Sequence, residues 1–283
     1  MLEGSFVKYF KKQADYREGP NKLIWDSSIA HFEKFADGRD FRFRDINADL
    51  VEDFKEHLLR AKSMRDTGKR LSRNTALSYF NKVKATLRKA YKEQILASDV
   101  NAAVNGITES ESMRNYLTLE EAGILSRTPC DNEIVGRASL FSILTGLRYS
   151  DIEKLTWGDV QQSGTDTYIR FRQEKTEHAE NMPISEQARK LLGIPGAKKD
   201  IVFQGLQKWD VYRHLPLWLL QAGITKHITF HCFRHTYATL QLSLGTDIFT
   251  VSKMLGHKSI KTTQVYTKLV DEKKKEAANK ISF

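Results

Sequence analysis

Apolar residues recur at helical intervals through roughly the first 105 residues of the chain. The apolar positions of these runs are Phe6, Val7 and Phe10; Leu23, Ile24, Ile29, Phe32 and Phe35; Leu50, Val51, Phe54, Leu58 and Leu59; and Leu77, Phe80, Val83, Leu87 and Tyr91. Asn47 and Ser72 precede the third and fourth runs, where each side chain can cap a helix. Because this spacing places the apolar side chains on one face of each helix, we predict an all-helical domain over residues 1–106.

A polar stretch without apolar periodicity follows at residues 107–115 and is typical of a linker. The second domain, residues 116–283, opens with a capping-box pattern at Thr118 and Glu121. Apolar and polar residues alternate over 168–172, and polar residues and a second short apolar segment follow. This pattern predicts an antiparallel hairpin with Lys175 near its tip. Helices are predicted over about 119–127 and 132–145, and most clearly after about residue 185 over 215–220, 230–244 and 248–255. The fold class is therefore mainly α, with a small antiparallel sheet in a mixed second domain.

The charge of the chain is concentrated in one segment. Residues 60–92 hold eleven lysines and arginines and one acid, so their net excess equals the +10 of the whole chain. A basic surface gains affinity for nucleic acid by displacing the counterions condensed on phosphates. The alternative is an ordinary solvated helix face, but the concentration favours DNA. The candidate DNA-binding residues are Arg70, Arg73, Lys82, Lys84, Arg88 and Lys92.

The sequence contains no segment that predicts membrane insertion or secretion. No stretch approaches the roughly 20 apolar residues that span a bilayer, and the first residues form no apolar signal core. The two cysteines, Cys130 and Cys232, lie far apart and cannot form a disulfide framework. We expect a soluble, intracellular protein with both thiols reduced.

Phosphate-binding side chains gather near the C-terminus around one tyrosine. His231 and Arg234 stand three residues apart in a predicted helix, so that they project from one face. His257 follows in Leu-Gly-His, and Tyr266 lies nine residues later. Upstream, an apolar helix ends at a glycine turn that leads to Arg148. Because guanidinium groups grip two phosphate oxygens at once, this set predicts a phosphodiester site around a tyrosine nucleophile.

These residues resemble the tyrosine recombinase (phage integrase) family. Its signature is an arginine in T-G-x-R, a lysine in a β-hairpin, an H-x-x-R pair, a histidine in L-G-H and a tyrosine nine residues later. The six positions are occupied in order by Arg148, Lys175, His231, Arg234, His257 and Tyr266. The resemblance is strong over residues 113 to 270, and the run ending at Tyr266 is more similar to integrases of phages and conjugative transposons than to chromosome-dimer resolving enzymes. Cys232 and Asp151 depart from the common Asp and Glu.

The resemblance implies the chemistry. Tyr266 is expected to attack a phosphodiester, forming a 3′-phosphotyrosyl link and releasing a 5′-hydroxyl. The expected assistants are Arg148, Arg234 and His257 on the phosphate, Lys175 as the acid for the leaving oxygen, and His231 for the tyrosine proton. A covalent intermediate retains the energy of the ester for rejoining, so no cofactor is expected.

The resemblance also implies the partners. The helical domain is expected to be a SAM-like core-binding domain, which forms a C-shaped clamp with the catalytic domain around double-stranded DNA at core or attachment sites. Four protomers are expected to act on two duplexes with exchange of the C-terminal tail, and a host or element-encoded DNA-bending factor is an expected accessory. The expected place of action is the cytoplasm of a bacterial or phage-infected cell, at the nucleoid. Larger integrases carry a further arm-binding domain, and this sequence is expected to start at the core-binding helices, whether as part of a longer protein or as a naturally short enzyme.

Each residue alone also has an ordinary structural explanation. Tyr266 can be a packed aromatic, Arg148 a helix C-cap and Lys175 a solvated turn lysine beside acids. The joint order of all six favours site-specific recombination that integrates and excises a mobile element. The alternatives are a type IB topoisomerase and a non-cleaving DNA-binding protein of the same fold. His231 and His235 also suit zinc, but no H-E-x-x-H pattern or nearby second cysteine completes a site, so no metal is predicted.

Overall fold

The chain divides into two compact units, Met1–Ser112 and Met113–Phe283. The computed structural model describes residues 2–267 except 65, 67, 111–113 and 173–178, and leaves the side chains of 171, 172, 179 and 180 undescribed. The division falls inside the predicted linker, 107–115. The first residues of that segment pack on the first unit, where Ile107 is buried and the Asn74 side chain accepts a hydrogen bond from the Ser110 amide at 2.9 Å.

The first unit is built mainly from helices, as predicted, and its described residues also form isolated β-bridges between Ser5 and Arg42 and between Lys62 and Arg70. Its elements are α1 (Phe6–Asp15), α2 (Gly19–Ala36), the short 3-10 helix η1 (Phe43–Asp45), α3 (Ala48–Arg60), α4 (Arg73–Lys92) and α5 (Val100–Ala103). The two predicted caps are confirmed, because Asn47 Oδ1 accepts from the Leu50 amide at 2.9 Å and Ser72 Oγ from the Thr75 amide at 3.1 Å. The apolar stripes meet in one core that includes Phe10, Phe32, Phe54 and Phe80.

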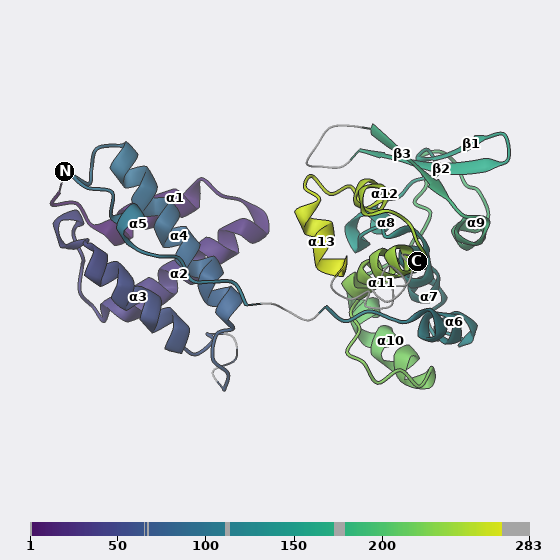
Figure 1. Cartoon of the computed structure of the whole chain (residues 1–283), viewed down its shortest axis with the longest axis horizontal. Helices are drawn as coiled ribbons and strands as arrows, with labels where there is room; N and C mark the ends of the chain where they lie inside the picture. Colours follow the sequence, from purple (N-terminus) through teal and green to yellow (C-terminus); the bar gives the residue numbers. More distant parts are fainter. Residues whose placement is uncertain (1, 65, 67, 111–113, 173–178, 268–283) are drawn as a thin grey trace, which may run out of the picture. The chain divides into compact units, whose positions relative to one another are not determined.

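The second unit combines helices with one small sheet (Figure 1). Its helices are α6 (Leu119–Arg127), α7 (Glu133–Thr145), α8 (Tyr149–Glu153), α9 (Glu186–Leu192), α10 (Lys208–Gln221), α11 (Phe230–Ser243), α12 (Ile248–Met254) and α13 (Lys261–Thr267). The strands β1 (Val160–Ser163), β2 (Asp166–Arg172) and β3 (Ala179–Ile184) form an antiparallel sheet in the order β1-β2-β3. Ile169 pairs with Met182 across β2 and β3, and both are buried.

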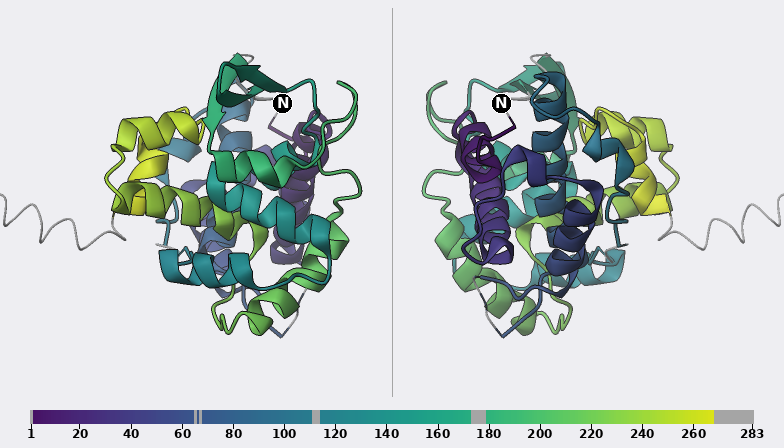
Figure 2. Two further views of the ribbon diagram at one scale, coloured as in Figure 1. Left: turned by 90° about the vertical axis from the view of Figure 1, so that its right-hand side faces the viewer. Right: turned by 90° about the vertical axis from the view of Figure 1, so that its left-hand side faces the viewer.

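The helix α7 lies at the centre of the second unit and is buried on several sides. It packs against α9, α10 and α11, and its buried positions include small residues such as Gly136, Ala138 and Ser139. The sheet lies at the end of this unit opposite α10, while α12 and α13 lie beside α11 (Figures 1 and 2). The ends of α7 and of α12 are thereby brought next to α11. No helix in the described part of the chain is long and apolar enough to cross a membrane.

Two elements extend beyond the segments predicted for them. The helix α10 begins at Lys208 rather than near Leu215, and β1 precedes the hairpin that was predicted from residue 168 on. Trp209 and Tyr212 are 70% and 72% exposed on α10, so apolar residues on its outer face obscure the helical period. Strand β1 is short, and three of its four residues are exposed. Lys175 and the predicted hairpin tip lie outside the described residues.

Candidate active site

Three candidate side chains project from the N-terminal part of α11. Thr229 caps the helix in a capping box in which Cys232 Sγ accepts from the Thr229 amide at 3.3 Å. The thiol sulfur therefore takes the place of the side-chain oxygen that accepts this hydrogen bond in an ordinary capping box. Arg234 and His235 are buried, whereas His231 is exposed and makes a T-shaped ring contact with His235 at a centroid distance of 4.6 Å.

The Arg234 guanidinium connects two loops that carry other candidate residues. Nη1 donates to the Gly146 carbonyl oxygen at 2.7 Å, and Nη2 donates to the Leu255 carbonyl oxygen. Gly146 lies two residues before Arg148, and Leu255 lies two residues before His257. Because a guanidinium has five N–H donors, these two bonds leave others for a ligand. Arg234 thus holds in place the two turns that present Arg148 and His257.

Arg148 is the N-cap of α8 and begins the turn of helix that follows α7. Its amide donates to Asp151 Oδ2 at 3.2 Å, and its Nη1 lies 3.7 Å from the same oxygen. The side chain is 40% exposed, so part of it is open to solvent. Asp151 therefore fixes the direction of Arg148 while leaving donors of the guanidinium exposed.

The His257 ring is held by α13. Its Nδ1 lies 2.7 Å from the Thr263 hydroxyl oxygen, and Thr263 is fully buried. This contact fixes the plane of the imidazole and leaves Nε2 on the opposite edge for a ligand. Thr263 stands three residues before Tyr266 on the same helix, so His257 and the candidate nucleophile share one support.

Tyr266 lies on α13 and is only 1% exposed. Its hydroxyl oxygen lies 2.8 Å from His235 Nδ1 and 3.4 Å from Arg114 Nη1, and the Arg114 guanidinium carbon lies 5.6 Å from the ring centroid. The sequence analysis missed Arg114, because Arg114 lies 152 residues before Tyr266 and no local pattern links the two. It considered His235 as a possible zinc ligand, whereas His235 is in contact with the hydroxyl.

The electrostatics of the site favour an anion. Burial, and then the positive charges of Arg234, Arg148 and Arg114, lower the pKa of His257 to about 4. Burial is also the largest cause for His235, whose pKa is lowered to about 3, and for His231, whose pKa is lowered as well.

Burial lowers the pKa of Arg234 to about 10, which leaves it charged at neutral pH. The imidazoles are therefore neutral while the arginines are positive, and in the described residues Asp151 is the carboxylate that pairs with one of them. A phosphodiester would supply the missing negative charge.

The candidate DNA-binding residues differ in solvent exposure and in the hydrogen bonds that their side chains already make. Arg70, Arg88 and Lys92 are exposed. Lys84 is half-buried, its Nζ donates to the Val104 carbonyl oxygen, and burial lowers its pKa. Lys82 Nζ donates to Asn21 Oδ1 at 3.3 Å, and Arg73 Nε donates to the Thr108 carbonyl oxygen at 2.8 Å.

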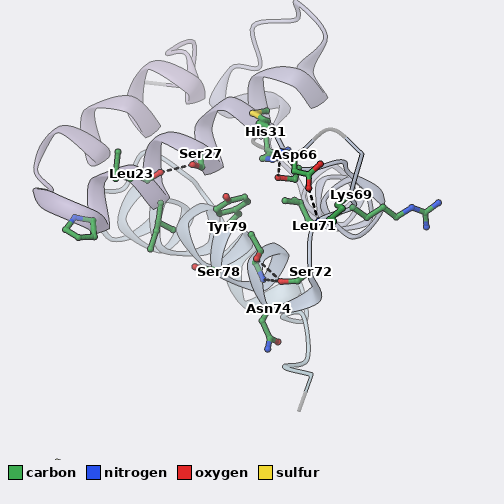
Figure 3. A pocket seen from close by; sticks show the side chains of 16 residues that line it. Leu23, Ser27, His31, Asp66, Lys69, Leu71, Ser72, Asn74, Ser78 and Tyr79 are labelled. Carbon is green, nitrogen blue, oxygen red and sulfur yellow. Dashed lines mark hydrogen bonds and ion pairs between the residues drawn. The ribbon is translucent and has the colours of Figure 1, made fainter. Parts of the chain in front are cut away.

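A cavity of about 770 Å³ lies between α2 and the start of α4 in the first unit (Figure 3). Side chains from both helices and from the segment before α4 line it, including Ser27, Lys69, Arg70, Asn74 and Ser78. Polar and basic side chains therefore line this cavity together with the apolar side chains of α2. The candidate DNA-binding residues of α4 do not line it.

Both units match models of one family. The second unit matches the phage integrase family over residues 115–273, and the first matches the phage integrase SAM-like domain over residues 5–104. The tyrosine recombinase XerD of Staphylococcus epidermidis is 25% identical over 93% of this chain and 86% of that protein. Its namesake in Oceanobacillus iheyensis is 28% identical over 72% of this chain and 73% of that protein. The tyrosine recombinase XerA of Saccharolobus solfataricus is 34% identical, but the match covers only 44% of this chain and 43% of that protein.

Solved structures share the fold. The XerH site-specific recombinase, in a post-cleavage complex with palindromic difH substrate, matches with a TM-score of 0.72 at 15% identity, over 97% of this chain and 94% of that one. The Tn1549 transposon integrase, in complex with circular intermediate DNA, matches with a TM-score of 0.67 at 19% identity, over 93% and 94%. Since the family model covers more than half of the chain and the fold agrees, the protein belongs to the phage integrase family of tyrosine recombinases.

Proposed function

We propose that this protein is a site-specific recombinase that breaks and rejoins duplex DNA through a 3′-phosphotyrosyl intermediate. The observation that supports this most is the meeting of Arg148, Arg234, His257 and Tyr266 around α11 in a positively charged site. An uncatalysed phosphodiester resists attack because the nucleophile approaches an anion and the leaving alkoxide is basic. Fixed guanidinium donors can neutralise the charge of the phosphate as the nucleophile approaches, without a metal ion.

Each side chain has a distinct role in this proposal. Arg148 offers its exposed donors, and Arg234 its remaining donors, to the nonbridging oxygens, while His257 Nε2 donates to the same phosphate. As the Tyr266 oxygen bonds to phosphorus, its proton passes to His231 and the bond to the 5′-oxygen breaks. Lys175, outside the described residues, is proposed to protonate that oxygen.

The partner is proposed to be double-stranded DNA at a core or attachment site. The XerH and Tn1549 proteins were solved in complexes with DNA, and a lambda integrase was solved as a tetramer bound to a Holliday junction. By analogy, four copies of this chain act together on two duplexes, and the reaction integrates and excises a mobile element. A host or element-encoded bending factor is part of the same proposal, as is action at the nucleoid.

A trapping experiment tests the proposed chemistry. Duplexes that carry a nick beside randomised sequence lose the short leaving strand after cleavage, so a covalent product accumulates and its DNA can be sequenced. The wild-type protein should form this product in excess EDTA, because side chains supply the charge. Tyr266→Phe should form none, while its duplex affinity stays within about threefold, since the hydroxyl contributes little to ground-state binding. Adduct formation by Tyr266→Phe would refute the assignment of the nucleophile, and an adduct that requires zinc would revive a metal site.

A further inference from the structure

The Tyr266 hydroxyl is held at two points by residues outside the six-residue signature. His235 Nδ1 lies 2.8 Å from the oxygen and Arg114 Nη1 lies 3.4 Å from it. Both contacts are formed within the second unit, and no hydrogen bond between His231 and this hydroxyl is recorded among the described residues. The orientation of the hydroxyl therefore depends on Arg114 and His235.

The two contacts have complementary chemistry. Guanidinium N–H groups can only donate, so Arg114 Nη1 points a donor and a positive charge at the phenolic oxygen. His235 is buried, and burial together with neighbouring positive charges lowers its pKa to about 3, so its ring is neutral and one nitrogen can accept. A phenol has one hydrogen to donate and lone pairs that accept. One donor and one acceptor thus satisfy it in a single orientation.

We propose that Arg114 and His235 are positioning residues that orient the Tyr266 hydroxyl for attack. His235 Nδ1 accepts the hydroxyl hydrogen, and the positively charged Arg114 guanidinium lies beside the hydroxyl oxygen. Neither residue touches the DNA phosphate in this role. During attack the hydroxyl hydrogen leaves its hydrogen bond to His235 and passes to His231, the group proposed to receive the proton. As negative charge develops on the oxygen, the Arg114 guanidinium stabilises it more than it stabilises the neutral phenol. This inference rests on the proposed recombinase function.

Arg114 is tested by a charge series. In single-turnover cleavage of a nicked duplex at saturating protein, Arg114→Gln should lower the rate about 10- to 100-fold. Arg114→Lys should recover part of that loss, because it keeps the charge but not the fork. The matched control is Arg213→Gln on α10, an exposed arginine that should leave the rate unchanged. An Arg114→Gln variant that cleaves as fast as wild type, or faster, would overturn the inference.

His235 is tested by an isostere pair. His235→Asn keeps an amide group near the position of Nδ1 and should retain more of the cleavage rate than His235→Phe, which keeps the ring volume and loses the acceptor. Saturating protein separates the rate from DNA affinity, so a defect that is only in binding would not appear. Equal rates for the two variants would mean that the ring acts by packing alone.

A measurement without DNA separates this inference from the proposed function. With 3-fluorotyrosine placed at position 266, the ¹⁹F resonance of the free protein should move in Arg114→Gln and in His235→Phe, and stay in place in Arg213→Gln. An unchanged resonance in both variants would contradict the proposed positioning by Arg114 and His235, even if the wild-type protein forms the covalent product. A moved resonance in a protein that forms no product on any nicked duplex would instead reject the recombinase proposal.

Discussion

At the scale of the residue, the signature side chains depend on contacts that the signature does not contain. Arg234 spans Gly146 and Leu255, Thr263 holds His257, and Asp151 holds Arg148. Local spacing predicted His231, Arg234 and His257, and the T-G-x-R position of the family signature predicted Arg148. Local spacing could not predict Arg114 beside Tyr266, because 152 positions separate them and only the packing of α13 brings them together.

Gly146 is the residue at which this dependence can be measured. It ends α7 with a φ of 71°, and a Cβ there would lie 2.6 Å from Tyr237 Cδ1 and 2.8 Å from Leu255 Cδ2. Gly146→Ala should therefore lower the free energy of unfolding by about 2–4 kcal/mol and slow cleavage, since strain and overpacking add and the turn presents Arg148. Urea unfolding followed by tryptophan fluorescence measures the first effect.

Gly164 provides the matched control. It also has a positive φ, of 61°, but a Cβ there would meet nothing within 4 Å. Gly164→Ala should cost only about 1 kcal/mol, from backbone strain alone. If the two variants lose equal stability, the close approach of Tyr237 and Leu255 to Gly146 is not what demands glycine.

At the scale of the element, helices with one polar face and a cap were predictable, and elements without those signals were not. The capping box of Thr118 and Glu121 starts α6 at Leu119 as expected, with the Thr118 amide 2.8 Å from Glu121 Oε2. The start of α10 was missed because its outer face carries Trp209 and Tyr212. Periodicity reports the contrast between faces, and it fails where both faces are apolar.

Helix α4 gives a prediction about DNA binding that uses the availability of its side chains. Replacing exposed Arg88 and Lys92 together with Gln should weaken binding to all duplexes and reduce the log–log salt slope by about 1.8, if each contacts one phosphate. Lys84→Gln should change the slope less, because its ammonium is bound to the Val104 carbonyl. Fluorescence anisotropy across a salt series measures the slope, with exposed Lys12→Gln on α1 as the control. An unchanged slope in the double variant would make this surface a solvated helix face.

At the scale of the whole molecule, the prediction of a mainly helical chain with a small antiparallel sheet is confirmed. The bounds predicted for the two domains stay a prediction. Patterns within each unit could be interpreted because secondary structure is locally encoded. The arrangement of protomers on DNA depends on surfaces whose partners lie on other chains, which no periodicity reports. The predicted C-terminal tail lies outside the described residues, so its role stays a prediction.

Deleting residues 272–283 tests that role. The apolar positions Ala277, Ala278, Ile281 and Phe283 have helical spacing, and a segment this short needs a docking surface to be stable. The deletion should spare folding of the monomer and DNA binding but impair ordered strand exchange. Sedimentation of protein–DNA assemblies and a two-duplex exchange assay measure the result. Full exchange with an unchanged assembly size would show that the tail is a solvated terminus.

The burial of Tyr266 has a practical consequence for finding this enzyme's activity. Electrophilic probes that label reactive phenols would modify exposed tyrosines such as Tyr212 and Tyr16, which are 72% and 62% exposed, and pass over a side chain that is 1% exposed. A proteome-wide survey with such reagents would therefore label the free protein at its exposed tyrosines and miss Tyr266. Its proposed chemistry would become visible only when duplex DNA is part of the assay, because the phosphodiester is the group that the phenol is proposed to attack.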